Sequence, residues 1–244
     1  MENTSLIAVS RQSALRRSMD VIANNLANMN TTGFKGEKMM FIEHLVRSRG
    51  GEKIGGDKLA FVRDIATAQD LSEGAFKSTS NPLDLAIHGD GFLVLSTPEG
   101  QRYTRNGNLQ MDATGQLVTR NGDPVLSDSN APFFLSPQDR SIDIGPDGTL
   151  STENGVLGKI AVVNFANRQA MRKVAGGMYS TSQQPIPVEQ PSIAQGMLES
   201  SNVQPIVEMT RMIEVSRSYE GTKNFIKRED DRMKQMIAEY ARPA

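Results

Sequence analysis

Hydrophobic residues near the start of the chain recur with the seven-residue period typical of a helix that packs against other helices. The stripe alternates steps of four and three residues, and its members are Leu15, Met19, Ile22, Leu26 and Met29. This spacing predicts an α-helix over residues 4–29. We expect Gly33 to close it in the left-handed conformation, with Phe34 folding back on Met29.

A second hydrophobic stripe lies near the other end of the chain. It is formed by Met209, Met212, Tyr219, Ile226, Met233, Ile237 and Tyr240, and Ile206 and Ile213 widen it. Pro205 suits the first helical turn, and Ser201 or Asn202 would cap the helix. Gly221 weakens the stripe, because glycine costs about 1 kcal/mol relative to alanine in a helix. Polar residues also interrupt it, so the helix suits packing among several helices.

Between the two stripes the pattern changes to short apolar runs separated by turn signals. The runs are residues 86–87, 92–95, 117–119, 125–126, 142–144 and 160–163. The turns are Asp90-Gly91, Asn106-Gly107, Thr114-Gly115, Asn121-Gly122, Asp147-Gly148 and Asn154-Gly155. Short strands that alternate with such pairs predict an antiparallel β domain.

The pattern therefore predicts an α+β protein whose terminal helices pair as a coiled-coil-like domain around a central antiparallel β domain. The expected parts are an N-terminal helix (1–35), an extended connector (36–80), the β domain (81–182), a second connector (183–200) and a C-terminal helix (201–244). Glycine pairs in the first connector and prolines in the second favour that interpretation. Two amphipathic helices alone would leave apolar edges uncovered, which indicates a protein that assembles with neighbours.

Composition narrows the function. The chain has 244 residues and a formal net charge of −1, so it offers no basic surface for nucleic acid. It contains no cysteine, which excludes disulfides and thiolate chemistry. We find no apolar run long enough to span a bilayer, and Arg11, Arg16 and Arg17 interrupt the only apolar stretch near the start. We therefore expect no membrane insertion and no cleaved signal peptide.

Candidate chemical motifs are incomplete. Residues 155–159 lack the spacing of a phosphate-binding loop, and Asp143 with Asp147 lacks the ligand spacing of a calcium loop. His88 and Asp90 have no nucleophile motif beside them. We predict no catalytic, cofactor, metal or small-molecule site. An enzyme with helical oligomerisation ends is the alternative, since carboxylates can converge invisibly in sequence; a pocket holding perturbed titratable groups would reveal it.

The segment that closes the first helix carries a recognisable motif. Residues 23–35 read ANNLANMNTTGFK, and further motifs are GDGF at 89–92, YTRNG at 103–107, DATGQLV at 112–118, QGMLESSNV at 195–203, MIE at 212–214 and RSYE at 217–220. Together they span nearly the whole chain and resemble the family of flagellar rod and hook proteins. Residues 67–74 and 81–84, with a short segment before the β domain, resemble a rod subtype other than the distal rod.

This resemblance implies a structural subunit of the flagellar basal-body rod. Members of the family assemble helically into a drive shaft that crosses the periplasm, and they are exported through the flagellar type III export apparatus without a cleaved signal. The implied partners are further copies of the chain, other rod proteins and the export apparatus. A distal-rod or hook-family axial protein is the alternative that the resemblance leaves open.

We expect the assembly interface to lie on the terminal helices and the motif beside them. Hydrophobic stripe residues would pack between helices, and the amides of Asn24, Asn25 and Asn28 would bond to adjacent helices or face solvent. The predicted interface comprises Leu15, Met19, Ile22, Asn24, Asn25, Leu26, Asn28, Gly33, Phe34, Asn202, Met209, Met212, Ile213, Tyr219 and Ile226. Both helices would order fully only in the assembly.

Overall fold

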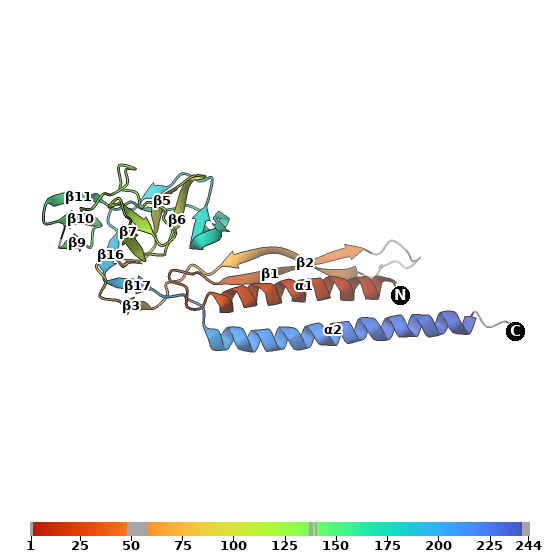
Figure 1. Ribbon diagram of the computed structural model, residues 1–244. Coiled ribbons are helices and arrows are strands. Elements are labelled where there is room, and N and C mark those ends of the chain that lie inside the picture. Colours follow the sequence, from red (N-terminus) through yellow and green to blue (C-terminus); the bar gives the residue numbers. More distant parts are fainter. Residues whose placement is uncertain (1, 48–57, 137–138, 140, 241–244) are drawn as a thin grey trace. The chain divides into compact units, whose positions relative to one another are not determined.

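The computed structural model describes residues 2–47, 58–136, 139 and 141–240 (Figure 1). The chain forms two compact units. The first, called the helical unit below, comprises Met1–Ala27, Glu37–Asp70 and Gln204–Ala244. The second, the β unit, comprises Asn28–Gly36 and Leu71–Val203. Two helices with an antiparallel β region confirm the α+β class.

The helical unit contains two helices and one hairpin. Its elements are α1 (Glu2–Ala27), β1 (Glu37–Arg47), β2 (Lys58–Gln69) and α2 (Pro205–Tyr240). Helix α1 contacts both the hairpin and α2. The two helices run antiparallel, since the start of α1 lies beside the middle of α2 and the end of α1 beside the start of α2 (Figure 1).

Residues 36–80, expected to be an extended connector, instead contain long paired strands. Strands β1 and β2 are antiparallel from the pair Glu37–Gln69 to the pair Arg47–Lys58, with a shift in register between Met40 and Phe41. The strands are rich in valine, isoleucine and phenylalanine, which favour extended backbone. The glycine pairs that suggested a connector fall at residues 50–51 and 55–56, outside the described residues.

The β unit consists of short antiparallel strands. Six of them form one sheet in the order β13 (Arg172–Val174), β14 (Met178–Ser180), β6 (Gly100–Thr104), β5 (Phe92–Thr97), β12 (Val162–Asn164) and β15 (Ile186–Pro187). A three-stranded sheet has the order β11 (Gly155–Lys159), β10 (Thr149–Thr152) and β9 (Ile142–Ile144). Single-turn helices η1 (Arg168–Ala170) and η2 (Ala175–Gly177) flank β13.

Three further strand pairs complete the unit. They are β16 (Ser192–Gln195) with β4 (Leu85–His88), β17 (Met197–Glu199) with β3 (Phe76–Ser78), and β7 (Leu109–Met111) with β8 (Leu117–Thr119). Residues 183–200 were also expected to be a connector, but they hold β15, β16 and β17. Each of these strands pairs with a strand far away in the sequence, which makes the segment part of the β unit.

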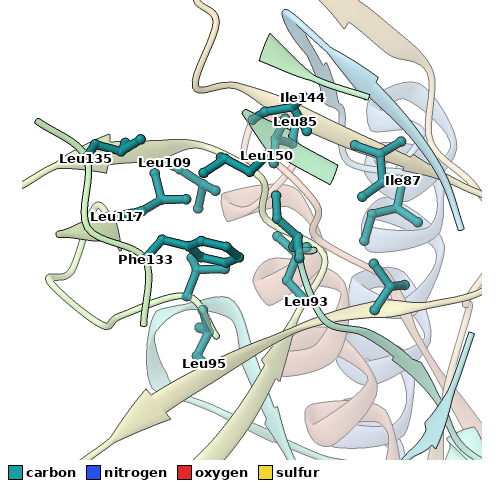
Figure 2. Packing of buried hydrophobic residues seen from close by; sticks show 14 residues of the cluster. Leu85, Ile87, Leu93, Leu95, Leu109, Leu117, Phe133, Leu135, Ile144 and Leu150 are labelled. Atoms are coloured by element: carbon teal, nitrogen blue, oxygen red, sulfur yellow. The ribbon is translucent and has the colours of Figure 1, made fainter. Parts of the chain in front are cut away.

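Two hydrophobic clusters form the core of the β unit. The larger one joins strands from both sheets with the loop at Phe133 and Leu135, and Leu93, Leu117 and Leu150 are fully enclosed in it (Figure 2). The smaller cluster is aromatic: the ring centroids of Tyr103 and Phe165 lie 4.7 Å apart in an edge-on arrangement. The unit buries a core of its own, as a separately folding domain requires.

Both helix ends differ from the prediction. Helix α1 ends at Ala27, and two turns follow, in which the Thr31 N–H donates to Asn28 and the Phe34 N–H donates to Thr31. Gly33 has the expected positive φ of 67°, but it lies six residues beyond the helix and does not cap it. Glycine is needed at this position for another reason, which is the close approach of the Arg105 backbone. A Cβ at Gly33 would lie 2.6 Å from the Arg105 carbonyl carbon.

At the other helix, Pro205 is the first helical residue, as predicted. Neither Ser201 nor Asn202 caps α2. The helix begins too late for their side chains to reach its first free N–H groups, and both residues belong to the β unit. The Ser201 hydroxyl instead accepts a hydrogen bond from the Val203 N–H.

Candidate assembly interface

The buried face of α1 shares Ile22 with the predicted stripe but is shifted toward Ala14 and Asn25. Ala8, Ala14, Ile22 and Asn25 are the buried residues of the described part of α1, whereas Leu15, Met19 and Leu26 are only half-buried. Alanine in such a seam lets a neighbouring backbone approach closely. The covered face of α1 is therefore narrower and made of smaller side chains than the large hydrophobic residues suggested.

Helix α2 is far less covered than α1. Met212, Tyr219 and Ile226, which recur every seven residues, are half-buried, and Glu208 is the only buried residue among the described residues of the helix. The predicted interface residues Met209 and Ile213 are 54% and 53% exposed. Further exposed apolar residues are Ile206, Val207, Met233, Ile237 and Tyr240. Within a single chain, much of the apolar stripe of α2 thus faces solvent.

A groove of about 450 Å³ lies between the two helices. Its lining comes from Ile7, Ala8 and Arg11 of α1 and from Ser218, Gly221, Thr222 and Phe225 of α2. Gly221, which sequence analysis treated only as a weak point, is exposed, and a Cβ there would meet no atom within 4 Å. The small residues on both helices keep this groove open.

Asn25 joins three elements of the helical unit. Its side-chain amide donates to the Glu37 carbonyl at 2.8 Å, and its side-chain oxygen accepts from the Glu37 N–H at 2.9 Å. The amide also lies 3.4 Å from the Glu208 carboxylate, which Arg211 holds at 2.9 Å. Asn25 therefore ties α1 to the first residue of β1 and to the first turn of α2.

The other two asparagines of the motif have different surroundings. Asn24 is exposed, and Asn28 lies in the β unit, where its side chain accepts a hydrogen bond from the Thr31 hydroxyl at 3.2 Å. The Asn25 amide reaches the neighbouring helix α2 through Glu208. The roles that we predicted for Asn24 and Asn28 between subunits stay predictions.

The segment after α1 is anchored in the β unit. Phe34 is buried, and the ammonium group of Lys173 lies 3.6 Å from the centre of its ring. The same ammonium group donates to the Lys35 carbonyl at 3.1 Å. Phe34 thus packs under a lysine of the β unit, while Met29, its expected partner, is 36% exposed.

A buried ionic cluster lies next to this segment, and sequence analysis did not find it. The Lys35 ammonium lies 2.5 Å and the Arg105 guanidinium 3.0 Å from the two carboxylate oxygens of Glu199, and all three side chains are nearly inaccessible. Gly74 donates its N–H to the same carboxylate at 2.9 Å, and Lys35 also donates to the Ser72 carbonyl at 2.7 Å. The available signal was that Lys35, Arg105 and Glu199 each lie in a family motif.

Ionisation of the cluster follows from its surroundings. Burial disfavours the charged form of Glu199, but Arg105 and Lys35 outweigh that effect and lower the pKa of the carboxyl group. Burial lowers the pKa of Lys35, and its contact with Glu199 opposes the shift. Lys35 and Glu199 are thus bonded to one another, and neither residue lines the groove between the two helices.

Asn202 completes the polar contacts of this region. Its side-chain oxygen accepts from the Gly36 N–H at 2.8 Å, and its amide donates to the Ser72 carbonyl at 3.1 Å. The residue was predicted as part of the assembly interface or as a helix cap. In the structure it connects three separate stretches of the β unit.

Among the residues that the structure describes, no cluster of three or more histidine, aspartate or glutamate side chains is arranged to hold a metal ion. No helix in that part of the chain is both long and apolar enough to cross a membrane.

Comparison with known proteins places these motifs. The profile "Flagella basal body rod protein" matches residues 6–35, "Flagellar hook protein FlgE/F/G D1 domain" matches residues 86–152, and "Flagellar basal body rod FlgEFG protein C-terminal" matches residues 194–239. The basal-body rod protein FlgF of Caulobacter vibrioides is 38% identical over 227 residues, which cover 91% of each chain. This chain belongs to the flagellar basal-body rod protein family.

Other relatives agree with the predicted subtype. FlgF of Mesorhizobium japonicum is 35% identical over 225 residues and 91% of each chain. FlgG of Bacillus subtilis is 32% identical over 254 residues, covering 94% of this chain and 96% of that protein. This chain is thus most like FlgF, with FlgG next. These relatives carry the names of structural rod proteins and not of enzymes.

Proposed function

We propose that this rod-family chain is a structural subunit of the flagellar basal-body rod, which assembles helically into the drive shaft that crosses the periplasm and transmits motor torque. The observation that carries the proposal is the family match over both terminal helices together with the apolar residues that α2 leaves exposed. Exposed apolar stripes of this kind are typical of surfaces that neighbouring subunits cover.

The proposed assembly mechanism uses the helices as an inner tube. Helices α1 and α2 pair in a coiled-coil-like manner within a subunit, and the uncovered side of α2 packs on neighbouring subunits. Its exposed interface residues, Met209 and Ile213, lie three and seven positions after Ile206, so the three side chains share one helical face. Burying each such side chain contributes about 1.5–3 kcal/mol, and the contribution repeats at every subunit.

The proposed partners are further copies of this chain, neighbouring rod proteins and the type III export apparatus that delivers subunits to the growing rod. Family membership supports these partners. The location that follows is the rod of the flagellar basal body, reached without a cleaved signal peptide and without insertion into the membrane.

A distal-rod or hook-family axial role is the second candidate, because FlgG also matches nearly the whole chain and two of the matching profiles include FlgE. Deleting the gene and imaging isolated basal bodies by electron microscopy separates the candidates by where the axis stops. We expect an axis that stops within the proximal rod. A complete proximal rod that lacks its distal part would indicate the distal role, and a complete rod without a hook would indicate the hook role. Normal rods with normal swimming would contradict all three.

A further inference from the structure

The chain passes between the two units four times, after Ala27, Gly36, Asp70 and Val203. On the β-unit side, hydrogen bonds tie the adjoining stretches to one another. Asn202 bonds to both Gly36 and Ser72, and its N–H lies 3.4 Å from the Phe34 carbonyl. The stretch that follows α1 and the stretch that precedes α2 are therefore held together at one place in the β unit.

The Glu199 cluster fixes these stretches to the core of the β unit. Arg105, besides contacting Glu199, donates to the carbonyl groups of Ile87, Gly89 and Gly91 at 2.7–3.1 Å. Both carboxylate oxygens of Glu199 accept hydrogen bonds. Lys35 and Gly74 donate to one oxygen and Arg105 donates to the other, and all three donors belong to the β unit. A fully bonded buried charge holds its partners in one geometry, because separating them would leave an ion away from water.

Backbone contacts show that residues 28–36 fit closely into the same unit. The Gly33 N–H donates to the Glu199 carbonyl at 2.8 Å. The space left for a Cβ at Gly33 is occupied by the backbone of Arg105 and Asn106, so glycine is required at this close approach. The segment that sequence analysis assigned to the N-terminal helix is thus a component of the β unit.

We propose that Glu199, Lys35 and Arg105 form a latch that keeps residues 28–36 on the β unit whether or not the terminal helices are paired, and that the latch prepositions α1 and α2 for pairing. Without it, pairing would have to close the long loop of chain between the helices, and loop closure costs more entropy as the loop lengthens. With it, a short tether gives α1 a high effective concentration near α2. The purpose rests on the proposed function, since a rod subunit needs both helices in place.

Hydrogen exchange on the purified full-length protein tests the latch. Lys35→Met removes the ammonium group from the cluster and leaves the Arg105–Glu199 pair intact. We expect amide exchange in peptides covering residues 28–36 to accelerate about tenfold or more, while peptides from β5 and β6 stay unchanged. Lys77→Met, which replaces an exposed lysine of β3, is the matched control and should change neither region.

Two further measurements test the latch and the prepositioning of the helices. Glu199→Gln should also accelerate exchange at residues 28–36, and unchanged exchange in both variants would overturn the latch.

Cross-linking tests whether the latch prepositions the helices. Ala8→Cys and Thr222→Cys place thiols on opposite walls of the groove between α1 and α2, in a chain that has no other cysteine. In dilute solution, Lys35→Met should lower the intramolecular cross-linking yield with a bismaleimide at least about threefold. Unchanged yield with loosened residues 28–36 would refute prepositioning. Both measurements use the isolated protein and need no assembled rod. A negative result would therefore refute the latch without bearing on the proposed rod function.

Discussion

At the scale of single residues, buried polar side chains distinguish this protein more than its hydrophobic residues do. The Glu199 side chain is 1% exposed. Its carboxylate forms ion pairs with Lys35 and Arg105 and accepts a hydrogen bond from the Gly74 N–H. Desolvating a carboxylate is costly, and removal of one partner from a buried ion pair destabilises a protein far more than the loss of a surface pair. Substitutions in this cluster should therefore have large effects although none of its members is hydrophobic.

Glu199→Gln should lower the free energy of unfolding of the β unit at neutral pH by about 3 kcal/mol, because Lys35 and Arg105 lose their counter-charge. The effect should depend on pH. The pKa of Glu199 is lowered in the folded state, so its contribution is complete above the ordinary glutamate pKa of about 4.3 and is lost as the pH falls through the lowered value. Urea unfolding curves from pH 7 to acid pH should show the two proteins converging.

A difference between the two proteins that stays constant through the acid range would contradict this assignment. The matched control is Glu153→Gln, which removes the same charge from an exposed glutamate of the β unit. Its unfolding free energy should lie within about 0.5 kcal/mol of the parent protein at every pH.

Asn25→Ala should lower the stability of the helical unit by about 1–3 kcal/mol, because the Glu37 N–H and carbonyl lose their side-chain partner inside the protein. Thermal unfolding followed by circular dichroism measures the change. Asn224→Ala makes the same replacement at an exposed site of α2, where alanine should favour the helix. Equal effects of the two substitutions would show that Asn25 contributes only helix propensity.

At the scale of elements, α1 lies against both the hairpin and α2, and its covered face is built from small residues and Ile22. A charged side chain cannot be accommodated on this covered face, whereas the adjacent face of the same helix is exposed to solvent. The same substitution at a covered and at an exposed position therefore separates the role of the covered face from that of the helix itself.

Ile22→Asp should prevent assembly, because a carboxylate would have to be buried where a side chain now contributes about 1.5–3 kcal/mol. Motility and electron microscopy of basal bodies, with the variant as the only copy, measure the result. Ala23→Asp places the same charge on the exposed face of α1 and should preserve swimming. Normal rods built from the Ile22 variant would refute a role of the covered face.

Leu26→Asp changes a half-buried position of the same helix and should give an intermediate assembly defect.

Gly221→Ala should increase the helix content of α2 and its stability by about 1 kcal/mol, since the new methyl group meets no neighbour. Circular dichroism of the isolated protein measures this. A loss of helix would indicate that Gly221 marks a bend that the protein requires.

Gly221→Leu would instead fill the groove between α1 and α2. Impaired assembly with normal helix content would show that a neighbouring subunit binds in this groove.

At the scale of the whole molecule, the two units differ in how much of their surface they bury. The β unit has two hydrophobic clusters, whereas α2 leaves most of its length exposed. A pair of helices with so little covered surface is only marginally stable. The β unit should therefore persist under conditions in which the terminal helices open.

Limited trypsin digestion of the purified chain should remove residues from both ends and stop at the β unit. Arg16 and Arg17 in α1, and Arg211 and Arg217 in α2, are exposed cleavage sites. Mass spectrometry should show early products that lack the distal parts of α1 and α2 but retain Asn28–Gly36. Early loss of residues 28–36 would contradict their place in the β unit.

Sequence analysis found the elements with strong local patterns. Both helices, the strands at 92–95 and 142–144, and Pro205 in the first turn of α2 follow from periodicity and backbone chemistry. The hairpin at 37–69 escaped because its strands do not alternate cleanly and its glycine pairs suggested a linker. The Glu199 cluster escaped for a different reason: its members are separated by up to 164 residues, and only the fold brings them together.

The two helices of the pair are unequal in length. Helix α2 has 36 residues and α1 has 26, and because they run antiparallel, the C-terminal turns of α2 extend past the start of α1. Ten extra residues correspond to about 15 Å of helix. Ile237 and Tyr240 lie on this extension, 68% and 91% exposed. In the proposed rod, this exposed end would form one half of a joint that the next subunit completes. Addition of subunits would then continue until a different protein covers the last exposed end.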